Sequence, residues 1–363
     1  MRIILIFFFG LGLGFETSAQ RHYVCYYTPE RLVIDGSDGE KAWQKAAWTE
    51  DFTDIEGDIR PHPALRTRAK MLWDTANLYI YAEMQEPDLW SEMREHDMAL
   101  FKENNFEFFL DADNDTHNYF ELEINALGTV MDLFLPKPFR NGGKALMGWE
   151  ALGLRSAVHV SGTLNRPGDK DQGWSVEMAV PLQSFRMSGD KRLTDSSMVR
   201  FNFSRVEWER DVVDGRYVPR VDKATGRRLP EHNYVWSPQG IVNMHAPEKW
   251  GYVLFTSRPV GGDTVGFVLP AEEKARPYLW EVYDRQTKYR AEHGVYAADL
   301  PTLGLFATVQ DAAGAVYRLR MEATFMQYTV MLTGSTFAGT LMIDQDGKVG
   351  LGNGGASRAV DRL

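Results

Sequence analysis

Apolar and polar side chains alternate along much of the chain, and residues 105–135 show this pattern most clearly. Apolar residues there occupy every second position: Phe106, Phe108, Leu110, Phe120, Leu122 and Ile124. A period of two is typical of β-strands that bury one face. The sequence DADND at 111–115 consists of residues that tolerate tight turns. We therefore predict three antiparallel strands with tight connections in this stretch.

The other face of these predicted strands is rich in carboxyl and amide groups. It carries Glu107, Glu121, Glu123, Asn125 and, from the third strand, Asp132. Such a face is either a solvated convex surface or the floor of a groove that binds a polar ligand. The sequence leaves both interpretations open.

Further short strands with turn signals between them are predicted throughout the first two thirds of the chain. They fall at residues 22–28, 155–164, 173–182, 200–210 and 251–255, with a hairpin at 66–86. A polar excursion at 209–233 has no apolar period, and Trp43 and Trp48 belong to a helical turn that closes one end of the core. The prediction is a mainly β fold, an antiparallel two-sheet β-sandwich of jelly-roll type with about nine to eleven strands.

The pattern changes after a Pro/Gly-rich linker at 258–270. Residues 271–293 have helical character, and Gly294 is placed to end the helix. Strands are expected at 315–324, 326–334 and 336–352. We predict a sandwich over 20–257 and a small C-terminal α+β unit over 271–363.

The first 19 residues have the pattern of a secretory signal peptide, with cleavage expected after Ala19. The apolar run is too short to span a bilayer comfortably, which argues against a membrane anchor. We expect an exported protein, periplasmic or extracellular, without a membrane span after cleavage.

The charge of the chain narrows the class of ligand. The formal net charge is −10, and it stays −10 without the predicted signal peptide, which holds one arginine and one glutamate. An acidic exported protein is poorly suited to nucleic acid or anionic lipid, so neutral or cationic ligands fit better. Cys25 is the only cysteine, which excludes an intrachain disulfide and a thiolate zinc cluster.

Several segments, taken in order, carry a family resemblance. They are VIDG, KMLWDTANLYIYAEMQEPD, NNFEFFLDADNDTHNYFELEINALGTVMDL, KPFRNGG, GWSVEMAVP, FNFSRVEW and APEKWGY. Together they resemble the family-9 carbohydrate-binding-module-like domains of the DOMON-like superfamily, in the form found in exported proteins of Bacteroidetes. The resemblance covers about residues 31–255. It implies a jelly-roll-like sandwich, carbohydrate binding and a role in the breakdown of polysaccharides of the xylan or cellulose type.

Members of that family hold a sugar between two tryptophans with polar residues beneath, so loop tryptophans and nearby polar residues are the candidate ligands. Aromatic faces stack on sugar rings, and planar polar groups bind hydroxyls. The candidates are Trp90, Asn125, Asp132, Arg140, Trp149, Arg205, Glu207, Trp208 and Trp236. The alternative is that the tryptophans pack in the core while the arginines form salt bridges with the sheet-face carboxylates.

A cation site is also a candidate. Asp111, Asp113 and Asp115 have the spacing of a loop that gathers oxygens around Ca²⁺, and the resemblance implies structural calcium. The glycine and the distant glutamate of an EF-hand loop are missing, and a plain hairpin turn is the alternative.

Two function classes other than binding are compatible with parts of the sequence. Glu121 and Glu123 lie two residues apart, roughly 6.5–7 Å between Cα atoms, so spacing alone permits a glycoside hydrolase. Because the chain lacks Ser-His-Asp, phosphate-loop and HExxH signatures, we predict a non-catalytic binding protein. Some DOMON relatives bind haem through methionine and histidine, which Met84, Met93, His96, His159 and His245 could supply, but we expect no haem. The C-terminal unit is a candidate surface for a protein partner.

Overall fold

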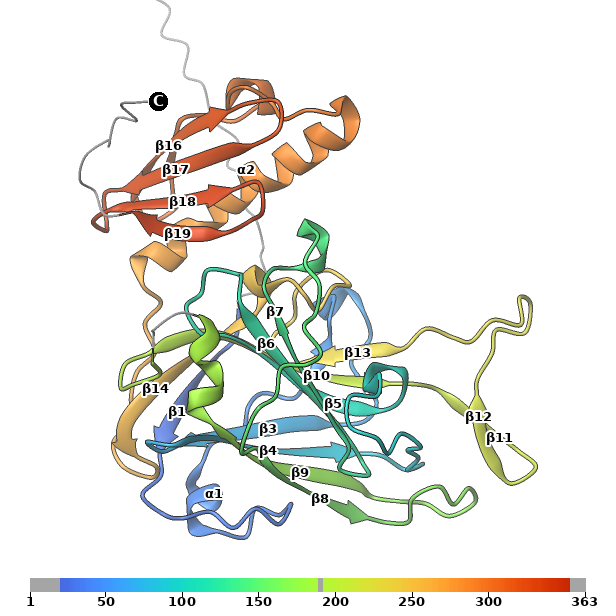
Figure 1. Cartoon of the computed structure of the whole chain (residues 1–363). Helices are drawn as coiled ribbons and strands as arrows, with labels where there is room; N and C mark the ends of the chain where they lie inside the picture. Colours follow the sequence, from blue (N-terminus) through green and yellow to red (C-terminus); the bar gives the residue numbers. More distant parts are fainter. Residues whose placement is uncertain (1–19, 189–191, 353–363) are drawn as a thin grey trace, which may run out of the picture.

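The computed structural model describes residues 20–188 and 192–352, so the predicted signal peptide lies outside the described residues. Figure 1 shows a large β unit and, above it, a smaller unit made from the C-terminal residues. Within the described ranges, no helix has the length and apolar character needed to cross a bilayer.

The large unit is built on a single hydrogen-bonded sheet of twelve strands. Its main path runs β7 (Val130–Leu135), β6 (Tyr119–Asn125), β5 (Asn105–Asp111), β10 (Met198–Glu207), β14 (Gly251–Pro259), β1 (His22–Tyr27), β3 (Thr67–Trp73), β4 (Asn77–Gln85), β9 (Gly173–Pro181) and β8 (Arg155–Ser161). Beside this path, β13 (His232–Val235) pairs with β10 and with β2 (Thr53–Asp54).

Strand β1 joins the two halves of this sheet. It runs parallel to β14, with His22 opposite Tyr252, and parallel to β3, with Tyr26 opposite Leu72. The mainly β prediction is confirmed. The expectation of two separate, purely antiparallel sheets is not met, because this parallel strand makes the hydrogen bonding continuous and the sheet curls on itself.

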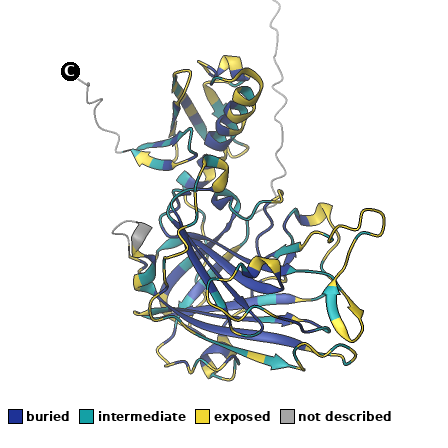
Figure 2. Ribbon diagram, turned by 45° about the vertical axis from the view of Figure 1, so that its right-hand side comes forward, coloured by how far each residue is buried: buried dark blue, intermediate teal, exposed yellow. Residues whose placement is uncertain are grey.

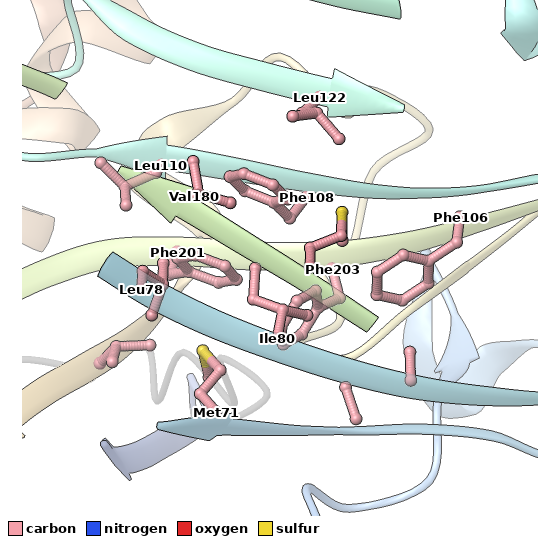
Figure 3. Packing of buried hydrophobic residues seen from close by; sticks show 14 of the residues in the cluster. Met71, Leu78, Ile80, Phe106, Phe108, Leu110, Leu122, Val180, Phe201 and Phe203 are labelled. Carbon is pink, nitrogen blue, oxygen red and sulfur yellow. The ribbon is translucent and has the colours of Figure 1, made fainter. Parts of the chain in front are cut away.

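The core lies where the two halves face each other. Figure 3 shows Phe106, Phe108 and Leu110 of β5 among the side chains that meet residues of β4, β9 and β10. These three side chains are at most 1% exposed. Truncating a fully buried phenylalanine to alanine typically costs about 3–5 kcal/mol, so this period-two face is a major source of stability.

The local chemistry of the predicted hairpin at 66–86 explains its turn. Strands β3 and β4 pair from Thr67–Met84 to Trp73–Leu78. The Asp74 Oδ1 atom accepts hydrogen bonds from the amides of Ala76 and Asn77, both at 2.7 Å. This aspartate therefore caps the turn with its own side chain.

Four strands of the large unit were missed by the sequence analysis: β2, β13 and the two strands of an isolated ribbon. The ribbon consists of β11 (Arg210–Val213) and β12 (Arg216–Pro219) and projects from the unit in Figure 1. It lies in the polar excursion, and most of its residues are exposed or half-buried, so no apolar alternation marks it.

Helical elements are few and short in the large unit. Helix α1 (Lys41–Lys45) buries Trp43, as the prediction of a helical turn there required. The 3₁₀ turns within the described residues are Gly57–Ile59, Leu100–Lys102, Phe139–Asn141, Leu182–Ser188, Pro247–Lys249 and Pro301–Leu303.

The C-terminal unit has its own core. Helix α2 (Ala271–His293) packs on a sheet ordered β15 (Thr308–Gln310), β16 (Val316–Ala323), β17 (Tyr328–Gly334), β18 (Thr340–Asp344) and β19 (Val349–Gly352). Gly294 adopts a left-handed conformation, φ 78°, and its amide bonds the Arg290 carbonyl, which ends the helix. Figure 2 shows the helix buried on the side facing the sheet and exposed on the other.

Buried polar contacts join the two units. Glu273 of α2 bonds Arg200 of β10 at 2.9 Å and Tyr252 of β14 at 3.0 Å. On the sheet side of the C-terminal unit, the Val349 amide donates to the Asp115 carbonyl at 3.0 Å. Both the helix and the sheet of the C-terminal unit are therefore anchored to the large unit.

Candidate functional site

The acidic face predicted from the strand pattern lies on the outer side of β5 and β6, opposite the core. Register places Glu107 directly across from Glu123, and Glu121 across from Phe109. Like charges directly opposite each other in a sheet are unfavourable. The stability of the sheet therefore does not explain why Glu107 and Glu123 face each other.

The carboxyl groups on this face are not solvated. Glu107 is 3% exposed, Glu121 5% and Glu123 1%. Loops from three separate parts of the chain rise around this face. Of the two interpretations left open by the sequence, the structure therefore excludes a solvated surface and gives a covered floor.

A cavity of about 550 Å³ stands on this floor. Its base comprises Glu107, Phe109, Glu121, Glu123, Met131, Leu133 and Val206. Its walls include Ile55, Asp97, Ala99, Phe101, Phe139, Ala145, Met147, Glu231, Asn233, Val242, Asn243, Met244 and His245. Phe101 and Phe139 are each 47% exposed, so two aromatic faces border the opening. Concave sites with apolar walls and a few polar groups are the usual form of small-ligand sites.

Burial makes the carboxyls of the floor harder to ionise than exposed glutamates. Burial raises the pKa of Glu107 to about 7. Burial, together with the charge of Glu107, raises the pKa of Glu121 and of Glu123 well above the usual range. Asn105 Nδ2 donates to Glu107 Oε1 at 3.0 Å and to Glu123 Oε2 at 2.7 Å, which fixes both side chains. Perturbed carboxyls in a cleft mark a functional site more often than chance.

His245 forms part of the wall as a neutral side chain. Burial lowers its pKa to about 4. Its Nδ1 lies 3.1 Å from the Tyr119 hydroxyl, and its ring meets that of Phe139 edge-on with centroids 4.5 Å apart. These contacts hold Phe139 at the rim.

The two polar residues predicted at the ends of this face do not line the cavity. Asn125 is fully buried and bonds Glu103 and the amides of Leu127 and Thr129, so it shapes a turn. The placement of Asp132 on the carboxylate face was wrong. Asp132 pairs with Leu122 and therefore shares the side of the sheet that faces the core, because residues opposite each other point the same way.

The predicted arginines and Glu207 make ion pairs elsewhere. Arg140 bonds both carboxylate oxygens of Glu248, at 2.9 and 2.8 Å. Arg205 is buried, bonds Glu86 at 2.8 Å and lies 3.4 Å from Glu207. The salt-bridge interpretation thus describes these residues, although their partners are not the carboxylates of the cavity floor.

The four candidate tryptophans lie outside the described lining of the cavity. Trp236 is fully buried, and Trp149 packs on Phe120 with ring centroids 5.0 Å apart. Trp90 is 4% exposed and is covered by the Arg210 guanidinium, 3.4 Å from the ring centroid. Trp208 is half-buried beneath Arg228.

The aromatic residues that do border the cavity were missed. Phe101 and Phe139 lie in loops where the sequence shows no strand period. The aromatic ligands predicted from the sequence are tryptophans instead. Trp208 touches this rim indirectly, since its Nε1 donates to the Phe101 carbonyl at 3.0 Å. The available signal was position: both phenylalanines lie in loops that flank the acidic strands.

The Asp111–Asp115 loop gathers carboxylate oxygens as the spacing predicted. Oxygens of Asp111, Asp113 and Asp115 lie within 4.8 Å of one another. Burial and the neighbouring charges of Asp113 and Asp115 raise the pKa of Asp111. An all-oxygen donor set is what Ca²⁺ prefers, so these residues fit that ion.

A second group of possible ligands surrounds His96. Its Nε2 lies 3.1 Å from both Glu150 carboxylate oxygens and 3.5 Å from Asp97 Oδ1 and Asp132 Oδ1. Although burial opposes it, bonding to Glu150 and the charges of Asp97 and Asp132 raise the pKa of His96. A charged His96 held by three carboxylates accounts for this group.

The residue types considered for haem are spread over different environments. Met84 lies in the main core and Met93 packs on a smaller cluster, whereas His159 lies on β8. His96 and His245 have the partners described above.

Comparison with known proteins decides the family. The model of the carbohydrate family 9 binding domain-like family matches residues 34–226, a little over half of the chain. The chain belongs to this family. The match covers every strand of the cavity floor, and the resemblance seen in the sequence is confirmed.

Solved structures give weaker similarities to this family 9 chain. A candidate carbohydrate-binding protein from Bacteroides uniformis is 15% identical over 65% of this chain and 100% of its own, with a TM-score of 0.46. A family 9 carbohydrate-binding module from Caldicellulosiruptor kristjanssonii, in complex with cellotriose, is 16% identical over 69% and 100%, with a TM-score of 0.40. The same organism's module with glucose covers 68% and 100%, at 16% identity and a TM-score of 0.38. At these levels they do not bear on the ligand of this chain. No match is found among curated proteins.

Proposed function

We propose that this family 9 protein binds carbohydrate in the cavity above β5 and β6. The observation that carries the proposal is the covered acidic floor beneath an aromatic rim. Carboxyl oxygens at Glu107, Glu121 and Glu123 can accept hydrogen bonds from sugar hydroxyls. The faces of Phe101 and Phe139 offer apolar surface to a pyranose ring.

The finer proposal is an exported, non-catalytic protein that serves the breakdown of xylan- or cellulose-type polysaccharide. It is supported by the signal-like sequence at 1–19 and by family membership. We also propose structural Ca²⁺ at Asp111, Asp113 and Asp115, where it would offset the charge of adjacent carboxylates, one of which, Asp115, also pairs with Lys348 at 3.2 Å.

The test is isothermal titration of residues 20–363 with xylo-, cello- and manno-oligosaccharides. Binding with a Kd between micromolar and millimolar is expected for at least one series. Phe139→Ala should weaken it at least fivefold, because it removes apolar surface from the rim. Phe325→Ala is the matched control, since Phe325 is 76% exposed on the C-terminal unit, away from the cavity. Absence of binding to all series would overturn the proposal.

Glycoside hydrolysis is the second candidate, favoured by the raised pKa of carboxyls that share one cavity. A carboxyl that stays protonated near neutral pH could act as a general acid. Release of reducing sugar from the same oligosaccharides, lost in Glu121→Gln, would establish catalysis and overturn the non-catalytic proposal.

A further inference from the structure

The lining of the cavity is acidic. Five acidic residues line it, namely Asp97, Glu107, Glu121, Glu123 and Glu231, and no lysine or arginine does so in the described part of the chain. The histidine in the wall, His245, is neutral near pH 7 because burial lowers its pKa to about 4. Asp97, at the edge, lies 3.5 Å from His96, whereas the three floor glutamates have no such neighbour at that distance among the described residues.

Three buried glutamates elsewhere in the chain pair with arginine. Glu86 bonds Arg205 at 2.8 Å, and Glu273 bonds Arg200 at 2.9 Å. Glu248 likewise bonds Arg140 at 2.8 Å. Each of these carboxylates is less than a tenth exposed. Two further buried glutamates, Glu103 and Glu177, have no cationic partner among the described residues, but each accepts at least three hydrogen bonds from neutral donors. A buried carboxylate is costly without a cation or a full set of donors.

The floor of the cavity has no cationic partner and few donors for its carboxyls among the described residues. The neutral side-chain amide of Asn105 donates hydrogen bonds to Glu107 and Glu123. Glu121 Oε2 accepts no hydrogen bond from any described residue, although the side chain is almost wholly buried. Its nearest basic atom is Nε2 of the neutral His245, 4.0 Å away. Among the described residues, Glu121 thus has neither a cation nor a full set of donors, and it faces a cavity that can admit a cation.

The size and walls of the cavity indicate what kind of cation enters. A volume of about 550 Å³ far exceeds that of a single metal ion, and much of the lining is apolar. An ammonium group offers three hydrogen-bond donors, enough to reach several carboxylates together. A cation near an aromatic face gains further attraction, and Phe109 lies on the floor beside Glu121.

We propose that the cavity selects sugars that carry a free amino group, such as glucosamine oligosaccharides, over the matching neutral sugars. This inference rests on the proposed function and names the substrate class for the same site. The ammonium group of the sugar lies on the floor of the cavity. It provides the positive charge that no lysine or arginine of the described lining provides. The pyranose ring lies against the apolar wall, and Phe101 and Phe139 border its exit.

The experiment compares three sugar series of equal length: glucosamine, N-acetylglucosamine and glucose trimers, all β-1,4-linked. Titrations of residues 20–363 are run at pH 7 and low salt, with and without EDTA. The glucosamine trimer is expected to bind at least tenfold more tightly than both others. N-acetylation is the matched control, since it keeps the ring and removes the charge.

Two variants separate a local effect from the net negative charge. Glu121→Gln should reduce the Kd ratio of glucose trimer to glucosamine trimer from tenfold to below threefold. Glu322→Gln makes the same change of charge on the C-terminal unit, at a side chain that is 61% exposed, and should leave the ratio unchanged. If Glu121→Gln does not fold, Glu107→Gln serves for the same comparison.

Each outcome decides the matter. Equal or weaker binding of the glucosamine trimer overturns the inference and leaves carbohydrate binding standing. A preference that both variants lower equally, or that neither lowers, also overturns it. A preference seen only when EDTA is omitted assigns the charge to a metal ion and overturns it too. Absence of binding to every trimer overturns both the inference and the proposed function.

Discussion

Arg200 Nη2 lies 2.9 Å from Glu273 Oε2, and this buried ion pair connects strand β10 to helix α2. Arg200 is 2% exposed and Glu273 6%. The Tyr252 hydroxyl also bonds Glu273, so one carboxylate holds two strands of the large unit. Because of these contacts, the C-terminal unit contributes to the stability of the large unit.

Removing Glu273 should destabilise the whole chain. Glu273→Ala leaves Arg200 buried without its counter-charge, which typically costs about 3–5 kcal/mol. Chemical denaturation followed by tryptophan fluorescence measures the loss. The control Glu322→Ala, on the exposed surface, should change stability by less than about 0.5 kcal/mol. Equal effects of the two variants would contradict this account.

The buried carboxyl of Glu107 should make stability depend on pH. Its pKa is about 7 in the folded chain, against an ordinary 4.5, so the folded state holds the proton more tightly. Its contribution is therefore fully present below pH 4.5 and is lost as pH rises through 7. Glu107→Gln should be more stable than the parent at pH 8, by about 1–3 kcal/mol, and should show a smaller decline between pH 5 and 8. Calorimetric melting at both pH values checks this, and parallel declines would refute it.

Calcium should stabilise both units together. The Asp111–Asp115 loop contacts the C-terminal unit, where the Asp115 carbonyl accepts from Val349 and the Thr116 hydroxyl donates to the Gly347 carbonyl at 2.6 Å. Added Ca²⁺ should raise the melting temperature by several degrees, and EDTA should reverse the shift. Asp113→Asn should remove the response. A Ca²⁺ response that survives this substitution would place the ion elsewhere.

Substitutions of Trp149 and Phe139 should affect different properties, the stability of the chain and its affinity for sugar respectively. Trp149 packs against Phe120 of the core, so Trp149→Ala should cost about 2–4 kcal/mol of stability. Phe139 is half exposed at the rim, so Phe139→Ala should weaken sugar binding with little change in the melting temperature. Thermal melting and titration of both variants test the contrast. A larger loss of affinity in folded Trp149→Ala than in Phe139→Ala would indicate that Trp149 belongs to the binding site.

The strand pattern predicted more of the fold than of the site. Alternation at 105–125 correctly separated the core face from the acidic face, because burial of one face constrains every second residue. It failed at Asp132, where the polar side chain turns toward the core side and bonds the Ala151 amide at 2.6 Å. A single buried polar residue with a hydrogen-bond partner breaks the pattern without changing the strand.

The cavity itself could not be predicted from periodicity. Its walls come from loops near residues 97–101, 139–147 and 231–245, which meet only in the folded chain. Tryptophan was the natural expectation for a sugar platform, yet the rings at the rim are Phe101 and Phe139. The position of both rings in loops beside the acidic strands was a signal, but position alone does not distinguish a loop aromatic at a cavity from one buried in the core, such as Trp236.

Strand β1 has a consequence for the order of folding. His22, close to the start of the described chain, pairs with Tyr252, 230 positions later. Strand β1 is also what joins the two halves of the sheet. During synthesis, the earliest strand must therefore wait for one of the last strands of its unit before the sheet can close. Contacts so distant in sequence slow folding, so we expect the large unit to reach its native state only after nearly all of its residues have been made.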